Sequence, residues 1–289
     1  MKRRMILVLF FVCTLFVFRA HVQAAETSSP FYVYTSLSEA KKGSKGIYSK
    51  LDTWSELCTY IQGKDSGTYY VRIIGNNNSV TVNKTLTVND GVIMHLFTEG
   101  NKTVKISTSG AAINVKGTLY LGSYGANNGL NATGHTITIS NTESRTGIGS
   151  AITVRGGKLV TYSEVRFKDI SANCSGAAIS LLDSNSEVYI NGSTFSGLSA
   201  KGANNTESLH CGGAIFISGD SSKSKLQLSG STITSCKAYA YGGAIYNGND
   251  SSTVIIKDGT NITNCSAGDA GGAIAAWGTI MGQLSRQKK

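Results

Sequence analysis

Apolar residues recur along this chain in short alternating runs, separated by turns rich in glycine and asparagine. The clearest runs follow residue 65, at 70–74, 80–82, 86–88, 92–94 and 104–106. Alternation with a period of two predicts half-buried β-strands, and the glycine and asparagine clusters predict turns between them. Five strands between Tyr70 and Ile106 leave no length for crossover helices, although hairpins remain open on this evidence alone.

A small-residue cluster that ends in isoleucine recurs and divides the chain into coils. The six copies end at Ile113, Ile152, Ile179, Ile215, Ile245 and Ile274. A recurrence roughly every 30 residues, with variable insertions, is typical of stacked repeats. We expect all six isoleucines to be buried, the last four of them in one continuous row.

Two further apolar positions complete each coil. A large apolar residue precedes the repeat isoleucine by a fixed offset, which is longer only where the polar stretch 201–208 is inserted; these residues are Phe167, Phe195, Ile233 and Ile262. A third strand follows the isoleucine, at 187–190, 225–228 and 253–256. Three strands and three bends per coil predict a stack in which each strand pairs with its equivalent about 4.8 Å away.

One segment has helical periodicity instead. Trp54, Leu57, Cys58 and Ile61 form a single apolar stripe, and Thr53 stands three residues before Glu56, as in a capping box. A stripe this narrow needs a surface to cover. We therefore predict a capping helix within residues 51–64 that covers the open end of the first coil.

The clusters at 212–215, 242–245 and 271–274 read Gly-Gly-Ala-Ile without substitution. They resemble the repeat of bacterial polymorphic outer-membrane proteins, which are parallel β-helix surface proteins. The resemblance spans roughly residues 65–277 and implies a right-handed helix, a bacterial source and an adhesin-like role. The companion motif of that family has asparagine where this chain has Ile170, Leu198, Cys236 and Cys265.

Residues 1–24 have the features of a secretory signal. A basic start precedes the apolar run from Met5 to Phe18, and small residues follow at 22–24. The run is short for a membrane span, so we expect cleavage after Ala24, a secreted or cell-surface product, and no stable membrane span afterwards. The segment holds four basic side chains and no acid, so without it the net charge falls from +10 to +6. The remaining basic residues are scattered and predict no nucleic-acid partner.

Five cysteines follow the signal, and an odd number argues against a fully paired disulfide framework. Cys236 and Cys265 follow Ile233 and Ile262 by three residues, so they should lie on adjacent coils, and we expect two thiols there. No cysteine or histidine has a metal-ligand spacing, so the sequence predicts neither a metal nor a cofactor.

Three tyrosines are the candidate binding residues. Tyr239, Tyr241 and Tyr246 cluster around one predicted corner, where they would form a platform for sugars or an ordinary side-chain ladder. Acids are sparse after residue 65, which disfavours the paired carboxylates of a glycosidase or an acidic calcium site. Asp183 and Glu187 flank one bend.

Together these features predict an all-β protein: a right-handed parallel β-helix with a short N-terminal capping helix. Its predicted parts are a signal at 1–24, a lead-in at 25–50 with some strand at 31–34, the capping helix at 51–64, the β-helix at 65–277 and an irregular basic tail at 278–289. We expect a non-enzymatic, adhesin-like protein that binds host or matrix glycans or proteins. The alternatives are a carbohydrate-active β-helix enzyme and a structural stalk. The tail is too short to cover a coil, so we expect truncation and end-to-end self-association.

Overall fold

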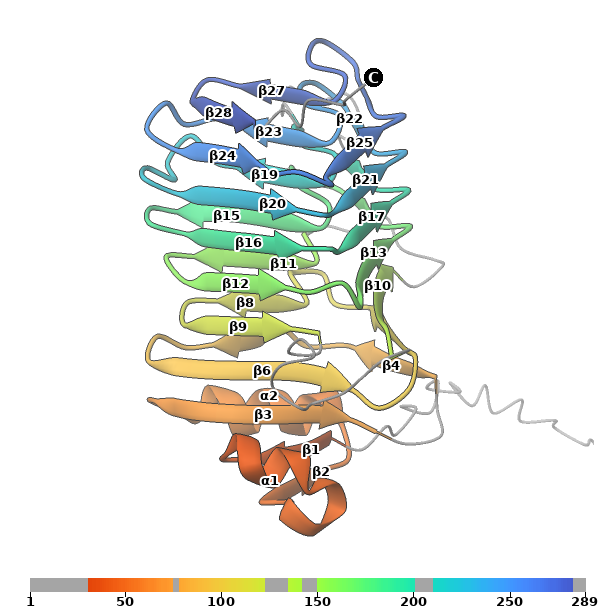
Figure 1. The fold of residues 1–289 in the computed structure, drawn as a ribbon, viewed down its shortest axis with the longest axis vertical. Coiled ribbons are helices and arrows are strands. Elements are labelled where there is room, and N and C mark those ends of the chain that lie inside the picture. Colours follow the sequence, from red (N-terminus) through yellow and green to blue (C-terminus); the bar gives the residue numbers. More distant parts are fainter. Residues whose placement is uncertain (1–30, 75–77, 123–134, 142–149, 201–209, 283–289) are drawn as a thin grey trace, which may run out of the picture.

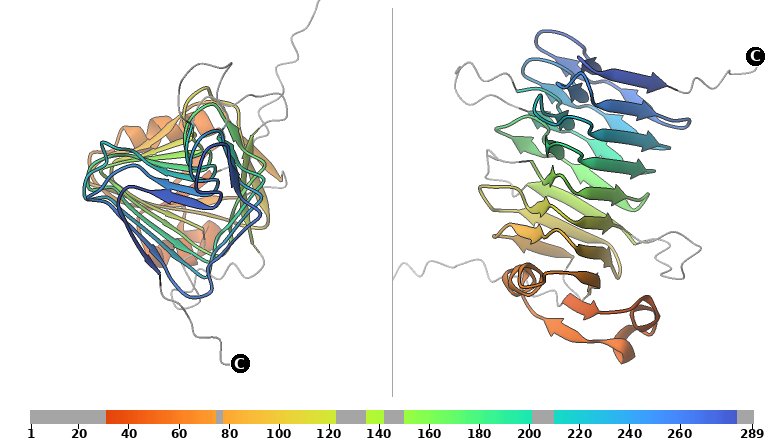
Figure 2. Two further views of the ribbon diagram at one scale, coloured as in Figure 1. Left: turned by 90° about the horizontal axis from the view of Figure 1, so that it is seen from above. Right: turned by 90° about the vertical axis from the view of Figure 1, so that its left-hand side faces the viewer.

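A computed structural model describes residues 31–74, 78–122, 135–141, 150–200 and 210–282. The predicted signal, the insertion at 201–208 and residues 283–289 of the predicted tail lie outside these ranges. Within them the chain forms an all-β, solenoid-like stack of parallel coils (Figure 1). Three long sheets form the sides of a roughly triangular cross-section (Figure 2).

Sheet A holds ten strands and contains the third strand of each coil. In order these are β2 (Ser49–Leu51), β1 (Phe31–Tyr34), β3 (Gly67–Ile73), β6 (Val92–Thr98), β9 (Thr118–Leu121), β12 (Lys158–Thr161), β16 (Glu187–Asn191), β20 (Lys225–Ser229), β24 (Thr253–Ile256) and β28 (Thr279–Gly282).

Sheets B and C hold seven strands each, and sheet D holds four short ones. Sheet B contains β25 (Asn261–Thr263), β21 (Thr232–Thr234), β17 (Thr194–Ser196), β13 (Val165–Lys168), β10 (Ile137–Asn141), β7 (Lys102–Ile106) and β4 (Ser79–Val82). Sheet C contains β27 (Ile274–Ala276), β23 (Ile245–Asn247), β19 (Ile215–Ile217), β15 (Ile179–Asp183), β11 (Ile152–Arg155), β8 (Ile113–Val115) and β5 (Leu86–Val88). Sheet D contains β14 (Ser171–Ala172), β18 (Ser199–Ala200), β22 (Lys237–Ala238) and β26 (Ser266–Ala267).

The chain winds from sheet to sheet instead of folding into hairpins. From β3 onwards, consecutive long strands belong to sheets A, B and C in turn, and each pairs in parallel with its equivalent in the next coil. Hairpins, which the sequence left open, are therefore excluded for the strands of the stack. Antiparallel pairing occurs where β1 joins β2 and β3.

The repeat isoleucines form one inward-facing row on sheet C. All six pair with one another in sequence order, and Leu86 begins the row. The predicted continuous row is confirmed and is longer than the four members expected. Five of the six are buried as predicted, but Ile274 is only half-buried because sheet C ends at its strand.

The large apolar residues that precede the repeat isoleucines form the matching row on sheet B. Phe167, Phe195, Ile233 and Ile262 pair consecutively, and the two phenylalanine rings stack with centroids 4.7 Å apart and planes 15° apart. These rows meet those of sheets A and C in one continuous core. Each inward side chain thus packs on the equivalent side chain of the neighbouring coil.

The predicted helix is α2 (Trp54–Gln62), shorter than the 51–64 segment assigned to it. Its four stripe residues are all buried. The Thr53 side chain accepts from the Glu56 N–H, and Glu56 accepts in return from the backbone N–H of Asp52. The Trp54 indole donates to the Lys84 carbonyl at 2.8 Å, so the helix is held against the turn that leads into β5.

The strand expected at 31–34 is β1, and two segments contain further regular structure that the sequence does not predict. The lead-in contains β1, β2, α1 (Leu37–Lys41) and the 3-10 turn Gly43–Gly46, and its Phe31 and Val33 are buried. Residues 279–282, assigned to an irregular tail, form β28 and pair with β24 in register. Both segments are short and join existing sheet edges, which supplies backbone partners that their own periodicity does not reveal.

Candidate functional site

Aromatic side chains gather on the outer face of sheet C, in the last coils of the stack. Tyr246 lies between the buried Ile245 and Asn247, so its ring faces outward. It pairs with Phe216 on the preceding coil, and their rings stack with centroids 5.8 Å apart and planes 7° apart. The next residue in this row is Ala275. The aromatic row therefore stops at Tyr246.

Tyr241 lies beside Tyr246 and also has an alanine on the next coil. Tyr241 forms a bridge with Ala270 on the next coil, and its ring centroid lies 6.2 Å from that of Tyr246. Because alanine has only a methyl group, the coil beyond covers little of either ring. Both tyrosines are half-buried. The two rings thus lie side by side, each next to an alanine of the following coil.

Trp277 lies beside Tyr246. Its side chain is 77% exposed, and its indole N–H donates to the Tyr246 hydroxyl at 3.0 Å. We call Tyr241, Tyr246 and Trp277 the aromatic step. Burial raises the pKa of Tyr246, so the hydroxyl stays protonated near neutral pH. It accepts from Trp277 and keeps its own proton to donate to a ligand.

The structure brings together two of the three tyrosines predicted from the sequence. Tyr239 is 55% exposed and follows β22, and among the described residues it makes no ring contact with Tyr241 or Tyr246. Sequence reasoning missed Phe216 and Trp277. Phe216 had a usable signal, since it and Tyr246 both directly follow a repeat isoleucine. Trp277 had none, because it lies in a turn.

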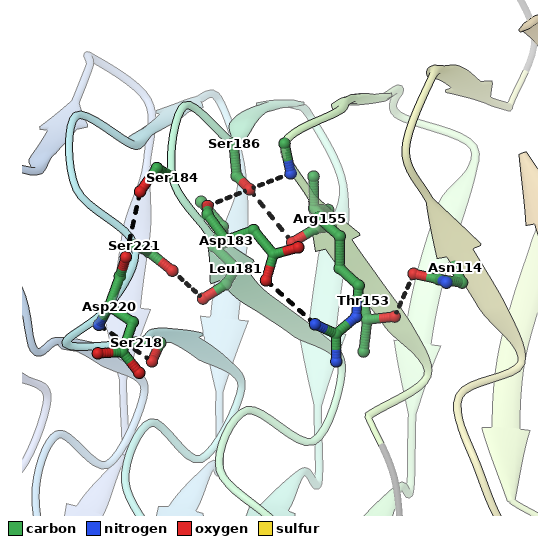
Figure 3. Close-up of polar contacts among 12 residues, drawn as sticks. Asn114, Thr153, Arg155, Leu181, Asp183, Ser184, Ser186, Ser218, Asp220 and Ser221 are labelled. Atoms are coloured by element: carbon green, nitrogen blue, oxygen red, sulfur yellow. Dashed lines mark hydrogen bonds and ion pairs between the residues drawn. The ribbon is translucent and has the colours of Figure 1, made fainter. Parts of the chain in front are cut away.

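The charged turns between sheets C and A form a second cluster (Figure 3). Arg155 pairs with Asp183 on the next coil at 3.1 Å, and Lys158 pairs with Glu187 at 3.6 Å. The two acids that flank the predicted bend therefore each face a cation from the neighbouring coil. Behind them the buried Ser186 hydroxyl donates to the Asp183 carbonyl. These contacts fasten one turn to the next.

A groove of about 400 Å³ runs along the first four of these turns. Its charged lining residues are Asp90, Lys116, Lys158 and Glu187. Its floor is backbone, since a Cβ on Gly117 would clash with the Asn89 carbonyl. Asp90 precedes β6 and Glu187 begins β16, so three strand spacings, or about 14 Å, separate their coils. That exceeds the roughly 5 to 9.5 Å between the carboxyls of a glycosidase pair.

Among the described residues, no group of three or more His, Cys, Asp or Glu side chains is placed to hold a metal ion. In the same part of the chain, no helix has the length and apolar character needed to cross a membrane. The chain matches no protein-family profile, no curated protein and no solved structure.

Proposed function

We propose that this chain is a secreted or cell-surface protein of the adhesin type, which binds glycans at the aromatic step. The observation that carries the proposal is that Tyr241 and Tyr246 lie side by side at the end of the Phe216 row, next to the exposed Trp277. The equivalent side chains on the next coil are alanines, and both tyrosines are half-buried, so part of each side chain is accessible to a ligand.

This arrangement suits a sugar ring on physical grounds. The face of an aromatic ring is electron-rich and attracts the slightly positive C–H groups of a pyranose. The Tyr246 hydroxyl adds a directional hydrogen bond at the edge of the ring, next to the Trp277 indole. A rigid sheet holds the rings in place, so little side-chain entropy is lost on binding.

The proposal includes two features of the architecture. We infer that the coils wind as a right-handed parallel β-helix, because strand–crossover–strand connections have this hand in about 98% of cases. We also infer that α2 caps the stack, and its buried stripe against the first coil supports this role. A capped, extended stack displays one face over many coils to a surface.

The separation between the coils of Asp90 and Glu187 in the groove supports binding without turnover. The ion pair between Glu187 and Lys158 supports it too. We therefore favour a glycan-binding protein over a carbohydrate-active enzyme. The discriminating assay incubates the purified chain with neutral and uronate-containing polysaccharides, with and without calcium, and measures new reducing ends and unsaturated products. Sustained product formation would favour the enzyme.

Binding itself is tested on an immobilised glycan array. We expect the unaltered chain to retain a defined set of glycans, and Tyr246→Ala and Trp277→Ala to weaken binding at least tenfold, about 1.4 kcal/mol. Tyr239→Ala is the matched control, because this exposed tyrosine lies outside the step, and it should bind normally. Tyr246→Phe separates the ring from the hydroxyl.

Two results would contradict the proposal. Equal glycan binding by Tyr246→Ala and the unaltered chain would show that the aromatic step is not the binding site. An array on which the folded chain binds no glycan would favour a protein ligand, or the structural stalk if a matrix-protein array is also negative.

A further inference from the structure

Cys236 and Cys265 occupy equivalent positions on two neighbouring coils. Three residues before the cysteines, Ile233 pairs with Ile262. One residue after them, Lys237 pairs with Ser266 in sheet D, so the register is the same on both sides. Equivalent residues of paired strands lie about 4.8 Å apart. This separation falls within the range of about 4.4 to 6.8 Å between Cα atoms that a disulfide spans.

The two side chains have the same orientation. The Cys236 thiol donates to the Thr234 carbonyl at 3.4 Å, and the Cys265 thiol donates to the Thr263 carbonyl at 3.2 Å. The Cys265 sulfur also lies 4.0 Å from the Ile233 carbonyl, on the coil of its partner cysteine. The two sulfurs therefore lie in one row, as free thiols.

Their environments differ in a way that assigns different roles. Cys236 is buried at 1% exposure, whereas Cys265 is half-buried and open to small reagents. Interaction between the two neighbouring thiols holds the pKa of Cys265 below its ordinary value and raises the pKa of Cys236, which burial raises further. Cys265 is thus the accessible sulfur with thiolate character.

We propose that Cys236 and Cys265 form a dithiol modification site, which low-molecular-weight disulfides such as glutathione disulfide oxidise to a disulfide between the last two coils. The site is independent of glycan binding at the aromatic step. Its product covalently fastens β25 and β26 to the coil below.

The chemistry takes two exchange steps. The Cys265 thiolate attacks one sulfur of glutathione disulfide, whose S–S bond breaks and releases one glutathione thiolate, which takes up a proton. Cys236 then loses its proton to water and attacks the Cys265 sulfur of the mixed disulfide, releasing the second glutathione. The protein loses two protons and two electrons, and one glutathione disulfide is reduced to two thiols.

The test treats the purified, reduced chain with glutathione disulfide, blocks the remaining thiols after unfolding, and maps the cysteines by mass spectrometry. We expect the loss of two thiols and a peptide that links Cys236 to Cys265. Cys265→Ser should keep its remaining thiol at this pair, Cys236, unmodified. Cys236→Ser should stop at the mixed disulfide on Cys265. Cys211→Ser is the matched control at another buried cysteine, and it should still lose two thiols.

Hydrogen exchange gives a second, independent readout of the same site. Oxidation of the unaltered chain should slow amide exchange in residues 261–282, and Cys265→Ser should abolish this difference. The proposal is overturned if the oxidised chain keeps all its thiols, if Cys265 links to another cysteine, or if Cys265→Ser still loses two thiols. The mapping of the unaltered chain decides the matter even where a serine variant folds poorly.

Discussion

The two ends of the coil stack bury the same kind of apolar row to different extents. At the N-terminal end, Leu86 begins the isoleucine row and is fully buried, with α2 lying against its strand. At the other end of the described residues, Ile274 and Ile262 are half-buried and Ile280 is 44% exposed. Each coil contacts only its neighbours, so an inward residue is buried only where something covers both its sides.

This difference bears on self-association. The exposed edges of β25, β27 and β28 offer backbone partners and apolar side chains together, which favours pairing with another edge. End-to-end association remains a prediction.

The largest expected effect breaks the isoleucine row at a fully buried position, one coil before the half-buried Ile274. Ile245→Asp places an unpaired carboxylate between two buried rows and should lower the free energy of unfolding by about 4 kcal/mol or more. Ile274→Asp, in the same row at the exposed end, should cost less than about half of that because its carboxylate reaches water. Urea unfolding of both variants measures the difference, and equal costs would contradict the comparison of the two ends.

The next effect compares the two tryptophans of the chain. Trp54 is 3% exposed, packs edge-on against Phe31 and donates to Lys84, so Trp54→Ala should cost about 3 kcal/mol or more. Trp277→Ala removes an exposed ring and should change stability by less than about 1 kcal/mol. Thermal unfolding at one protein concentration checks both. Similar shifts for the two variants would mean that α2 does not hold the first coil.

A pH effect should arise near the N-terminal end. His95 stacks between Tyr70 and Tyr120 with centroids 4.5 Å from each, and burial lowers its pKa from 6.5 to about 4. The unfolded chain therefore binds the proton more readily than the folded chain. Stability should be constant above pH 6.5 and fall as the pH drops towards 4, by about 3 kcal/mol at most. His95→Phe keeps a stacking ring without the titration, so its stability should depend less on pH in this window.

The sequence predicted the coils because the repeat constrains single residues. The isoleucine row, the Phe167 row and the third strands each follow from apolar residues that recur around the small-residue cluster, which contains a glycine pair in three of its copies. The small residues of that pair allow close approach of neighbouring backbones; at Gly213 and Gly243, for example, a Cβ would meet the carbonyl of the next coil. The sequence alone also shows that Phe216 and Ala275 occupy equivalent positions, because each directly follows a repeat isoleucine.

What escaped prediction depends on contacts between distant segments. The run at 31–34 predicted a strand, but it did not predict that β1 pairs with β3, because α1, β2 and α2 lie between them in the chain, or that Phe31 and Val33 are buried there. Likewise, Trp277 joins the aromatic step through a turn whose path the repeat does not fix. Both cases need the fold of the neighbouring coil before the residue's surroundings are known.

The smallest expected effect tests how α2 begins. Thr53→Ala removes the hydroxyl that accepts from the Glu56 N–H at 3.1 Å and should cost about 1 kcal/mol, whereas Thr53→Ser keeps an acceptor and should cost less. Ser36→Ala is the matched change at α1, where the serine accepts from the Glu39 N–H at 3.2 Å. α1 is a short helix with one buried side chain, Ala40, whereas α2 buries four side chains of the continuous core. Hydrogen exchange in β5 should therefore speed up after Thr53→Ala and stay unchanged after Ser36→Ala. Equal acceleration in both variants would show that the first coil does not depend on α2 for its protection.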